Sequence, residues 1–149
     1  MQIDRMEIVG LMVQDLDRAK EAFARALGLT FREFTVNETL MFTELDADGT
    51  DQRGLGAGAR IAMDTSNFIE LIQAPSADTP EGFRNIHIKV RNIDAAAQEM
   101  RDLGYTMVTN VQAGGMREVI FDATDLYGMR LCLTEYEAPS MIEAMLDQG

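Results

Sequence analysis

The sequence predicts an α+β fold made of two tandem βαβββ modules, and three observations support this prediction. Short apolar strands alternate with two amphipathic helices, the order of elements repeats after a linker at residues 74–80, and matching residues recur in both halves. Residues 13–17 (VQDLD) align with 90–94 (VRNID), and residues 69–71 (IEL) align with 131–133 (LCL). Because half of such a repeat cannot bury its own helix and sheet, we expect both halves to pack as one domain over residues 1–149.

The first module is predicted to cover about residues 1–75. Asp15 is placed to cap a helix over residues 16–27, and Gly28 supplies a left-handed stop. The strands are expected at residues 6–13, 31–36, 40–45, 60–63 and 68–72. Residues 46–58, rich in Gly and Asp, are predicted to be a loop, and residues 54–58 are expected to form a flap over the sheet.

The second module is predicted to cover about residues 83–137, followed by a short tail helix at about 140–147. Asn92 should cap a helix that Gly104 ends, and strands are expected at residues 85–90, 106–111, 117–121 and 129–134. In the tail, Ser140 and Glu143 have the spacing of a capping box.

Composition limits the classes of protein to which the chain can belong. The formal charge is −12 and the pI about 4.4, which disfavours nucleic acid as a partner. No apolar run is long enough to span a membrane, so no membrane partner is expected. The chain has one cysteine and begins without a signal-like segment, so a cytoplasmic location is predicted. Net charge does not fix the sign of the charge inside a cleft, so a local basic pocket for an acidic ligand is compatible with this composition.

Four segments of the chain resemble the vicinal-oxygen-chelate superfamily. They are residues 8–17 (IVGLMVQDLD), residues 22–23 (AF) with 27–29 (LGL), residues 68–71 (FIEL), and residues 122–128 (DATDLYG). The last segment resembles the superfamily's Asp-Pro-Asp-Gly turn with an insertion. The superfamily holds glyoxalase I, bleomycin-resistance proteins, extradiol dioxygenases and methylmalonyl-CoA epimerase. The resemblance implies a cup-shaped mixed sheet with the helices on its outside.

The resemblance also implies four inward-facing metal ligands on the first and last strands of each module. The matching positions are Ile8, Glu70, Asn85 and Cys132. Isoleucine offers no donor and an amide oxygen is a weak ligand for first-row metals. We therefore expect no metal and no other cofactor at the family site.

Strand alternation places a polar cluster on the cup side, with Glu70 and His87 as its candidate catalytic residues. His87 is interpreted equally well as a general acid or base and as a hydrogen-bonded structural histidine. Glu70 is either a proton acceptor or a carboxylate neutralised by Lys89 or Arg130. Function is favoured for the cluster as a whole, because burying so many polar groups without a ligand is costly.

The other candidate ligand-binding residues would form the rest of the cup. Cys132 is either a nucleophile activated by His87 or, as we favour, small packing material. Ile8, Met12, Phe68 and Ile72 are expected to give the cup an apolar wall, with ordinary core packing as the alternative.

Three functions are consistent with these residues. The first is a metal-independent lyase or isomerase in which Glu70 or His87 moves a proton on a carbonyl compound, while Lys89 or Arg130 holds an oxyanion. The second is a non-catalytic binder that resembles drug-sequestering bleomycin-resistance proteins, and the third is a metal-dependent glyoxalase or dioxygenase. A homodimer is expected from the resemblance to bleomycin-resistance proteins, which form dimers, and from the apolar tail helix at about 140–147.

Overall fold

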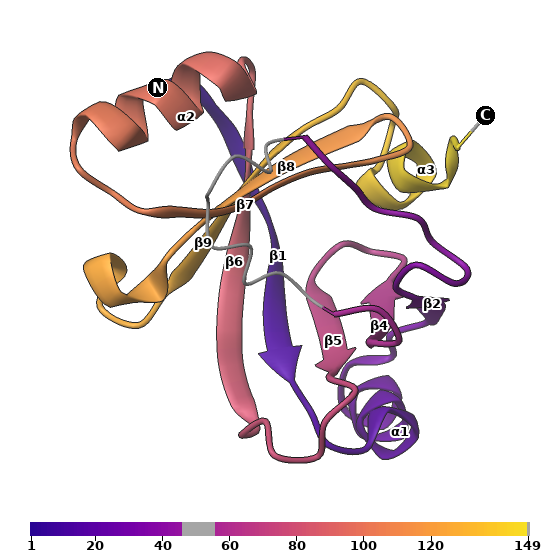
Figure 1. Cartoon of the computed structure of the whole chain (residues 1–149). Helices are drawn as coiled ribbons and strands as arrows, with labels where there is room; N and C mark the ends of the chain where they lie inside the picture. Colours follow the sequence, from indigo (N-terminus) through magenta and orange to yellow (C-terminus); the bar gives the residue numbers. More distant parts are fainter. Residues whose placement is uncertain (46–55, 149) are drawn as a thin grey trace.

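The described chain, residues 1–45 and 56–148 of this computed structural model, forms one mixed sheet curled into a cup (Figure 1). The first module supplies β1 (Ile3–Met12), α1 (Leu16–Leu27), β2 (Phe31–Thr35), β3 (Thr43–Glu44), β4 (Arg60–Asp64) and β5 (Ile69–Gln73). The second supplies β6 (Gly82–Val90), α2 (Ile93–Asp102), β7 (Met107–Ala113), β8 (Met116–Phe121), a 3-10 helix (Ala123–Leu126), β9 (Arg130–Glu135) and α3 (Met141–Leu146). The predicted α+β fold with a cup-shaped sheet is confirmed.

The sheet joins the two modules through their first strands. Its order is β2-β4-β5-β1-β6-β9-β8-β7-β3. Strand β1 pairs in parallel with β5, β6 pairs in parallel with β9, and β1 and β6 pair antiparallel at the centre. Equivalent strands therefore lie on either side of the β1–β6 seam, as a twofold repeat requires.

The helix caps expected from the sequence are present. The Asp15 carboxylate accepts a hydrogen bond from the Arg18 backbone N–H at 3.1 Å, and the Asn92 amide oxygen accepts one from Ala95 at 3.0 Å. Gly28 ends α1 at φ 68°, a left-handed conformation that costs glycine little. In the tail, the Ser140 hydroxyl accepts a hydrogen bond from the Glu143 N–H at 3.2 Å.

The alternation predicted for β1 is also found. Leu11 packs with Leu16 of α1 on the outer face, whereas Ile8 lies in a separate core cluster with Met63 and Met141 on the inner face. Helix α3 belongs to that inner cluster, so the C-terminal helix closes one side of the cup.

The strand predicted over residues 40–45 is wrong in length, and its pairing crosses to the other module. Only Thr43 and Glu44 form a strand, and they pair with Gln112 and Val111 of β7 in the other module. The chain thus leaves β2 at one edge of the sheet and reaches β7 at the opposite edge, and we call residues 36–45 the crossover segment. Most of the predicted loop, including the acidic residues at 46–48, lies outside the described residues.

Strand β6 carries a β-bulge that the sequence did not reveal. Gly10 pairs with Asn85, but the next residue of β1, Leu11, pairs with Phe83, so Arg84 is the extra residue. A bulge breaks the regular alternation of side chains and redirects the one that it inserts. Arg84 and Asn85 therefore both contribute to the inner side of the cup.

A buried carboxylate organises the turn between β4 and β5. The Asp64 side chain is fully buried and accepts hydrogen bonds from the backbone N–H groups of Ser66, Phe68 and Ile69. This turn takes Phe68 out of the strand alternation and leaves it 63% exposed. Phe68, expected in the cup wall, is instead on the surface.

Replacing Asp64 should destabilise the fold strongly. In Asp64→Ala the three backbone N–H groups lose their shared acceptor, and we expect a loss of roughly 1–3 kcal/mol in the free energy of unfolding. Urea unfolding measures this change, with the exposed Asp78→Ala as a control that should match the wild type. Equal stability of the two variants would contradict this account of the turn.

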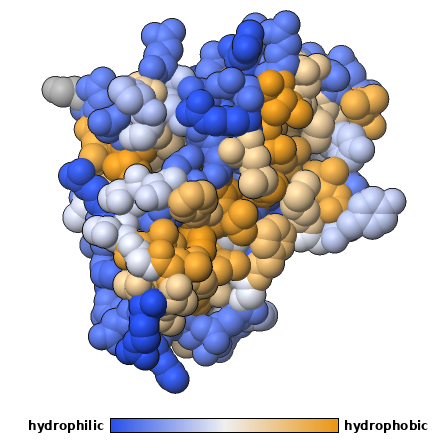
Figure 2. All heavy atoms as spheres, turned by 180° about the vertical axis from the view of Figure 1, so that it is seen from behind, coloured by the Kyte–Doolittle hydropathy of each residue, from blue (hydrophilic) through white to orange (hydrophobic). Residues whose placement is uncertain are grey.

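The outer surface combines charged helices with exposed apolar residues. Figure 2 shows hydrophobic side chains gathered across the middle of the face opposite to that in Figure 1. Among the large apolar residues that are more than half exposed are Met6, Phe68 and Phe83. None of the helices in the described ranges is long and apolar enough to cross a membrane.

Candidate active site

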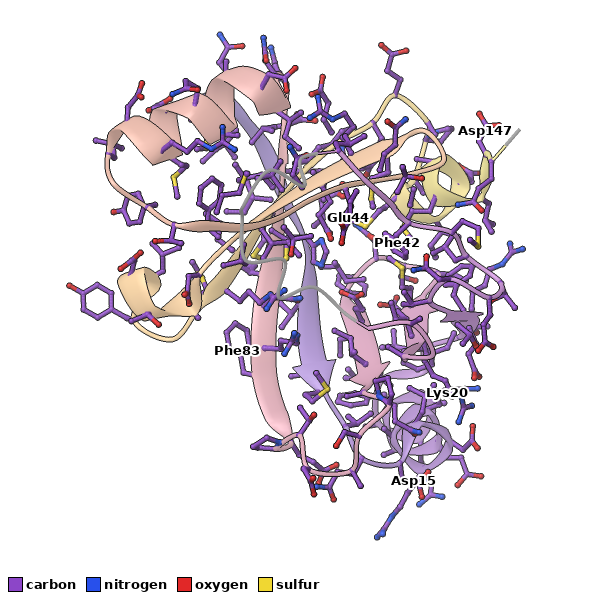
Figure 3. All side chains as sticks on the ribbon, viewed as in Figure 1. Asp15, Lys20, Phe42, Glu44, Phe83 and Asp147 are labelled. Carbon is purple, nitrogen blue, oxygen red and sulfur yellow. The ribbon has the colours of Figure 1, made fainter. Side chains whose placement is uncertain are left out.

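A cavity of about 290 Å³ opens on the inner side of the cup. Its polar lining includes Glu70, Asn85, His87 and Arg130, four of the residues that the sequence placed there. Its apolar wall comes from both modules and from α3, and includes Ile61, Met63, Met116, Ile120, Met141 and Met145. Figure 3 shows Phe42 and Glu44 of the crossover segment, which also line the cavity, near the centre of the molecule, whereas Phe83 projects away from them.

One imidazole lies between two carboxylates at this cavity. His87 Nε2 is 2.9 Å from Glu70 Oε2, and His87 Nδ1 is 3.3 Å from Glu118 Oε2. All three side chains are buried, at 4%, 6% and 8% exposure for His87, Glu70 and Glu118. The contact between His87 Nδ1 and Glu118 is close enough for charge attraction but does not form a hydrogen bond. Nδ1 therefore keeps its hydrogen-bonding capacity for a ligand.

For both His87 and Glu118, burial and the neighbouring charges shift the pKa in opposite directions. Burial by itself lowers the pKa of His87, but the Glu70 and Glu118 carboxylates outweigh it and raise that pKa above 6.5. Burial raises the pKa of Glu118 above its usual 4.5, although His87 and Arg130 oppose the shift. Both pKa values are therefore shifted upward at one buried site, an arrangement that is typical of acid–base chemistry.

Several buried polar atoms of the lining have no partner among the described residues. They include Asn85 Oδ1 and Thr109 Oγ1, whose side chains are 5% and 4% exposed. The Asn85 side chain fills the space over Gly10, where an added Cβ would come within 1.9 Å of Asn85 Oδ1. Since unpaired buried polar atoms are costly, they indicate a ligand with complementary polar groups.

The four family positions do not fit a metal ion. Ile8 is apolar and buried in the inner core, and Cys132 packs with Val108 and Ile120 and does not line the cavity. Burial raises the pKa of the Cys132 thiol well above 9.0. His87, Glu118 and Cys132 do bring donor atoms within 4.8 Å of one another, but only His87 and Glu118 of this set line the cavity, and His87 Nε2 already contacts Glu70. The chemistry below therefore uses only the side chains of the chain.

Two more of the predicted binding residues lie away from the cavity. Lys89 Nζ lies 4.0 Å from the centre of the Tyr136 ring and 3.9 Å from an Asp4 oxygen, farther along β6. Met12 is buried at the end of β1 and, like Ile72, does not line the cavity. Residues that share the inner face of a strand can be separated by its length, which alternation alone does not show.

The sequence interpretation missed five polar lining residues, of which Asn37 and Glu44 lie on the crossover segment. Thr109 lies on β7 and Glu118 on β8, where Met116, Glu118 and Ile120 alternate toward the cavity. That alternation was visible in the sequence, but the sequence did not show which face of β8 is turned toward the cavity. Arg84 could not be found in this way, because the bulge places it beside Asn85 rather than opposite to it.

The fold and the cavity define a class: βαβββ proteins whose curled sheet encloses a small-molecule site. A family model described as the Glyoxalase/Bleomycin resistance protein/Dioxygenase superfamily matches residues 9–121, and the chain belongs to this superfamily, the vicinal-oxygen-chelate superfamily. A comparison with curated protein sequences gives no match.

Solved structures share the fold at low sequence identity. Methylmalonyl-CoA epimerase from Mycobacterium tuberculosis is 21% identical, with a TM-score of 0.64 over 95% of this chain and 93% of the other. An epimerase variant from Streptomyces coelicolor in complex with 2-nitronate-propionyl-CoA is 19% identical, with a TM-score of 0.64 over 92% and 100%. A hypothetical protein from Bacillus halodurans is 19% identical, with a TM-score of 0.63 over 91% and 96%.

Proposed function

We propose that this protein is an isomerase or lyase that moves a proton on a carbon next to a carbonyl group. The observation that carries the proposal is His87 held between Glu70 and Glu118 at a cavity with an apolar wall. The neighbouring epimerases are isomerases by name, which agrees with this reaction class.

The chemistry follows from the two carboxylates. Ionised Glu118 takes a proton from the carbon, the C–H electron pair becomes the enolate, and the neutral Glu118 carboxyl or the His87 imidazolium returns a proton to another atom or face. Glu70 holds His87 in place and stabilises its charge, as the 2.9 Å contact indicates. Arg130 lines the same cavity and would stabilise the developing oxyanion.

Solvent exchange tests this function without knowledge of the natural substrate. In D2O the protein should incorporate deuterium next to the carbonyl of methylmalonyl-CoA or phenylpyruvate faster than a protein-free blank. Nuclear magnetic resonance measures the exchange, and Glu21→Gln, an exposed acid on α1, is a control that should match the wild type. Exchange at the rate of the blank with both compounds would contradict the proposal.

A second function, a non-catalytic binder, is favoured by the methionines of the apolar wall. Met63, Met116, Met141 and Met145 line the cavity, and flexible thioether side chains adapt to ligands of different shape. A binder should bind methylmalonyl-CoA or phenylpyruvate without catalysing deuterium exchange. In that case His87→Ala should change only the affinity for the ligand.

A further inference from the structure

The inner side of the cup carries a second guanidinium group, that of Arg84, to which the proton-transfer chemistry assigns no role. Arg84 and Arg130 both line the cavity. Arg130 pairs in register with Asn85, the residue after Arg84, so the two arginines come from adjacent positions on β6 and β9. The two cations repel each other, and the attraction of Arg84 to Glu70 is weaker than this repulsion and the cost of burial together.

The bulge in β6 directs Arg84 to this position. A regular strand would turn Arg84 to the outer face, opposite to Asn85, because successive side chains alternate. The extra residue in the register lets both side chains line the cavity. Bulges of this kind are found beside functional sites, where they redirect one side chain.

The partners of Arg84 also indicate a ligand. Its side chain is half-buried, and it forms no hydrogen bond or ion pair within residues 1–45 and 56–148. Burial and the charge of Arg130 both lower the pKa of the Arg84 guanidinium, so the cation is destabilised where it lies. A carboxylate would remove this cost, because its two oxygens match the paired N–H groups of a guanidinium.

We propose that Arg84, together with Arg130, binds a carboxylate group of the substrate, so that the substrate class is an apolar carboxylic acid with a carbonyl-activated C–H bond. The apolar body of such a compound lies against Ile61, Met63 and Met116, which line the same cavity. This inference rests on the proposed function for the position of the reacting carbon, whereas carboxylate binding does not require turnover.

Binding of two matched probes tests the inference. Hexanoate and hexanamide have the same size and apolar tail but differ in charge. We expect the wild type to bind hexanoate at least tenfold more tightly than hexanamide by isothermal titration calorimetry, and Arg84→Gln to remove that preference while binding of hexanamide stays unchanged. Arg18→Gln removes the same charge at an exposed helix position and should behave as the wild type.

A second variant keeps the test decisive if Arg84→Gln fails to fold. Arg84→Lys keeps the charge but loses the paired donors, and we expect it to weaken hexanoate binding severalfold. The inference is overturned if hexanamide binds to the wild type as tightly as hexanoate, or if folded Arg84 variants keep the preference. Loss of preference in Arg84→Gln together with no deuterium exchange in the wild type would support the carboxylate site and contradict the proton transfer alone.

Discussion

Glu118→Gln should slow deuterium exchange by roughly 10²–10⁴-fold, the usual contribution of a general base. The amide has the shape of the neutral carboxyl group but cannot accept the proton from carbon. Because burial raises the pKa of Glu118 and so favours its uncharged form, an uncharged amide of the same shape should preserve the fold.

The pH profile separates this catalytic role from a structural one. If Glu118 is the base, the wild-type exchange rate should rise with pH through a pKa above 4.5, and Glu118→Gln should lose that rise along with the rate. Circular dichroism should show the same melting behaviour for the variant and the Glu21→Gln control at pH 5. Wild-type exchange in folded Glu118→Gln would remove Glu118 from the mechanism.

His87→Ala should destabilise the protein more at acidic than at alkaline pH. The substitution leaves Glu70 and Glu118 buried around a site that has lost its cation, and breaking a buried ion pair costs roughly 3–5 kcal/mol. At pH 5 we expect a loss of about this size in the free energy of unfolding. At pH 8 the loss should be smaller, because the stabilisation by the His87 charge is lost as the pH rises through its folded pKa.

The wild type gives the sign of the pH effect. The pKa of His87 is raised in the folded protein, so its contribution to stability is fully present below pH 6.5 and is lost as the pH rises through the folded value. The raised pKa of Glu118 acts in the same direction from pH 4.5 upward. Urea unfolding at pH 5 and pH 8 measures both proteins, and His87→Ala combined with Glu118→Gln should recover part of the loss. An equal loss at both pH values would contradict the charge argument.

The sequence predicted what depends on local periodicity and caps. Asp15, Gly28 and Asn92 mark helix ends through short-range contacts, and the repeat itself indicated two equivalent modules. The crossover segment was not predictable in this way, because β3 has two residues and is defined by its long-range pairing with β7.

The candidate site was predicted as far as regular alternation holds. Glu70, Asn85 and His87 line the cavity as their strand positions implied, whereas Arg84 needed the bulge and Phe68 was displaced by the Asp64 turn. The carboxylates of Glu70 and Glu118 come from different modules, and their meeting at His87 is a property of the whole sheet. The homodimer and the cytoplasmic location stay predictions.

The bulge at Arg84 affects the orientation in which a ligand binds in the cavity. In the repeat alignment, which matches Val13 with Val90, the residue of the first module equivalent to Arg84 is Glu7. Glu7 is buried and accepts a hydrogen bond from the Tyr136 hydroxyl. A cup with true twofold symmetry would accept a molecule in either of two opposite poses, but Arg84 lines the cavity whereas Glu7 does not. We therefore expect an anionic molecule to bind in one preferred pose, with its anionic group at Arg84.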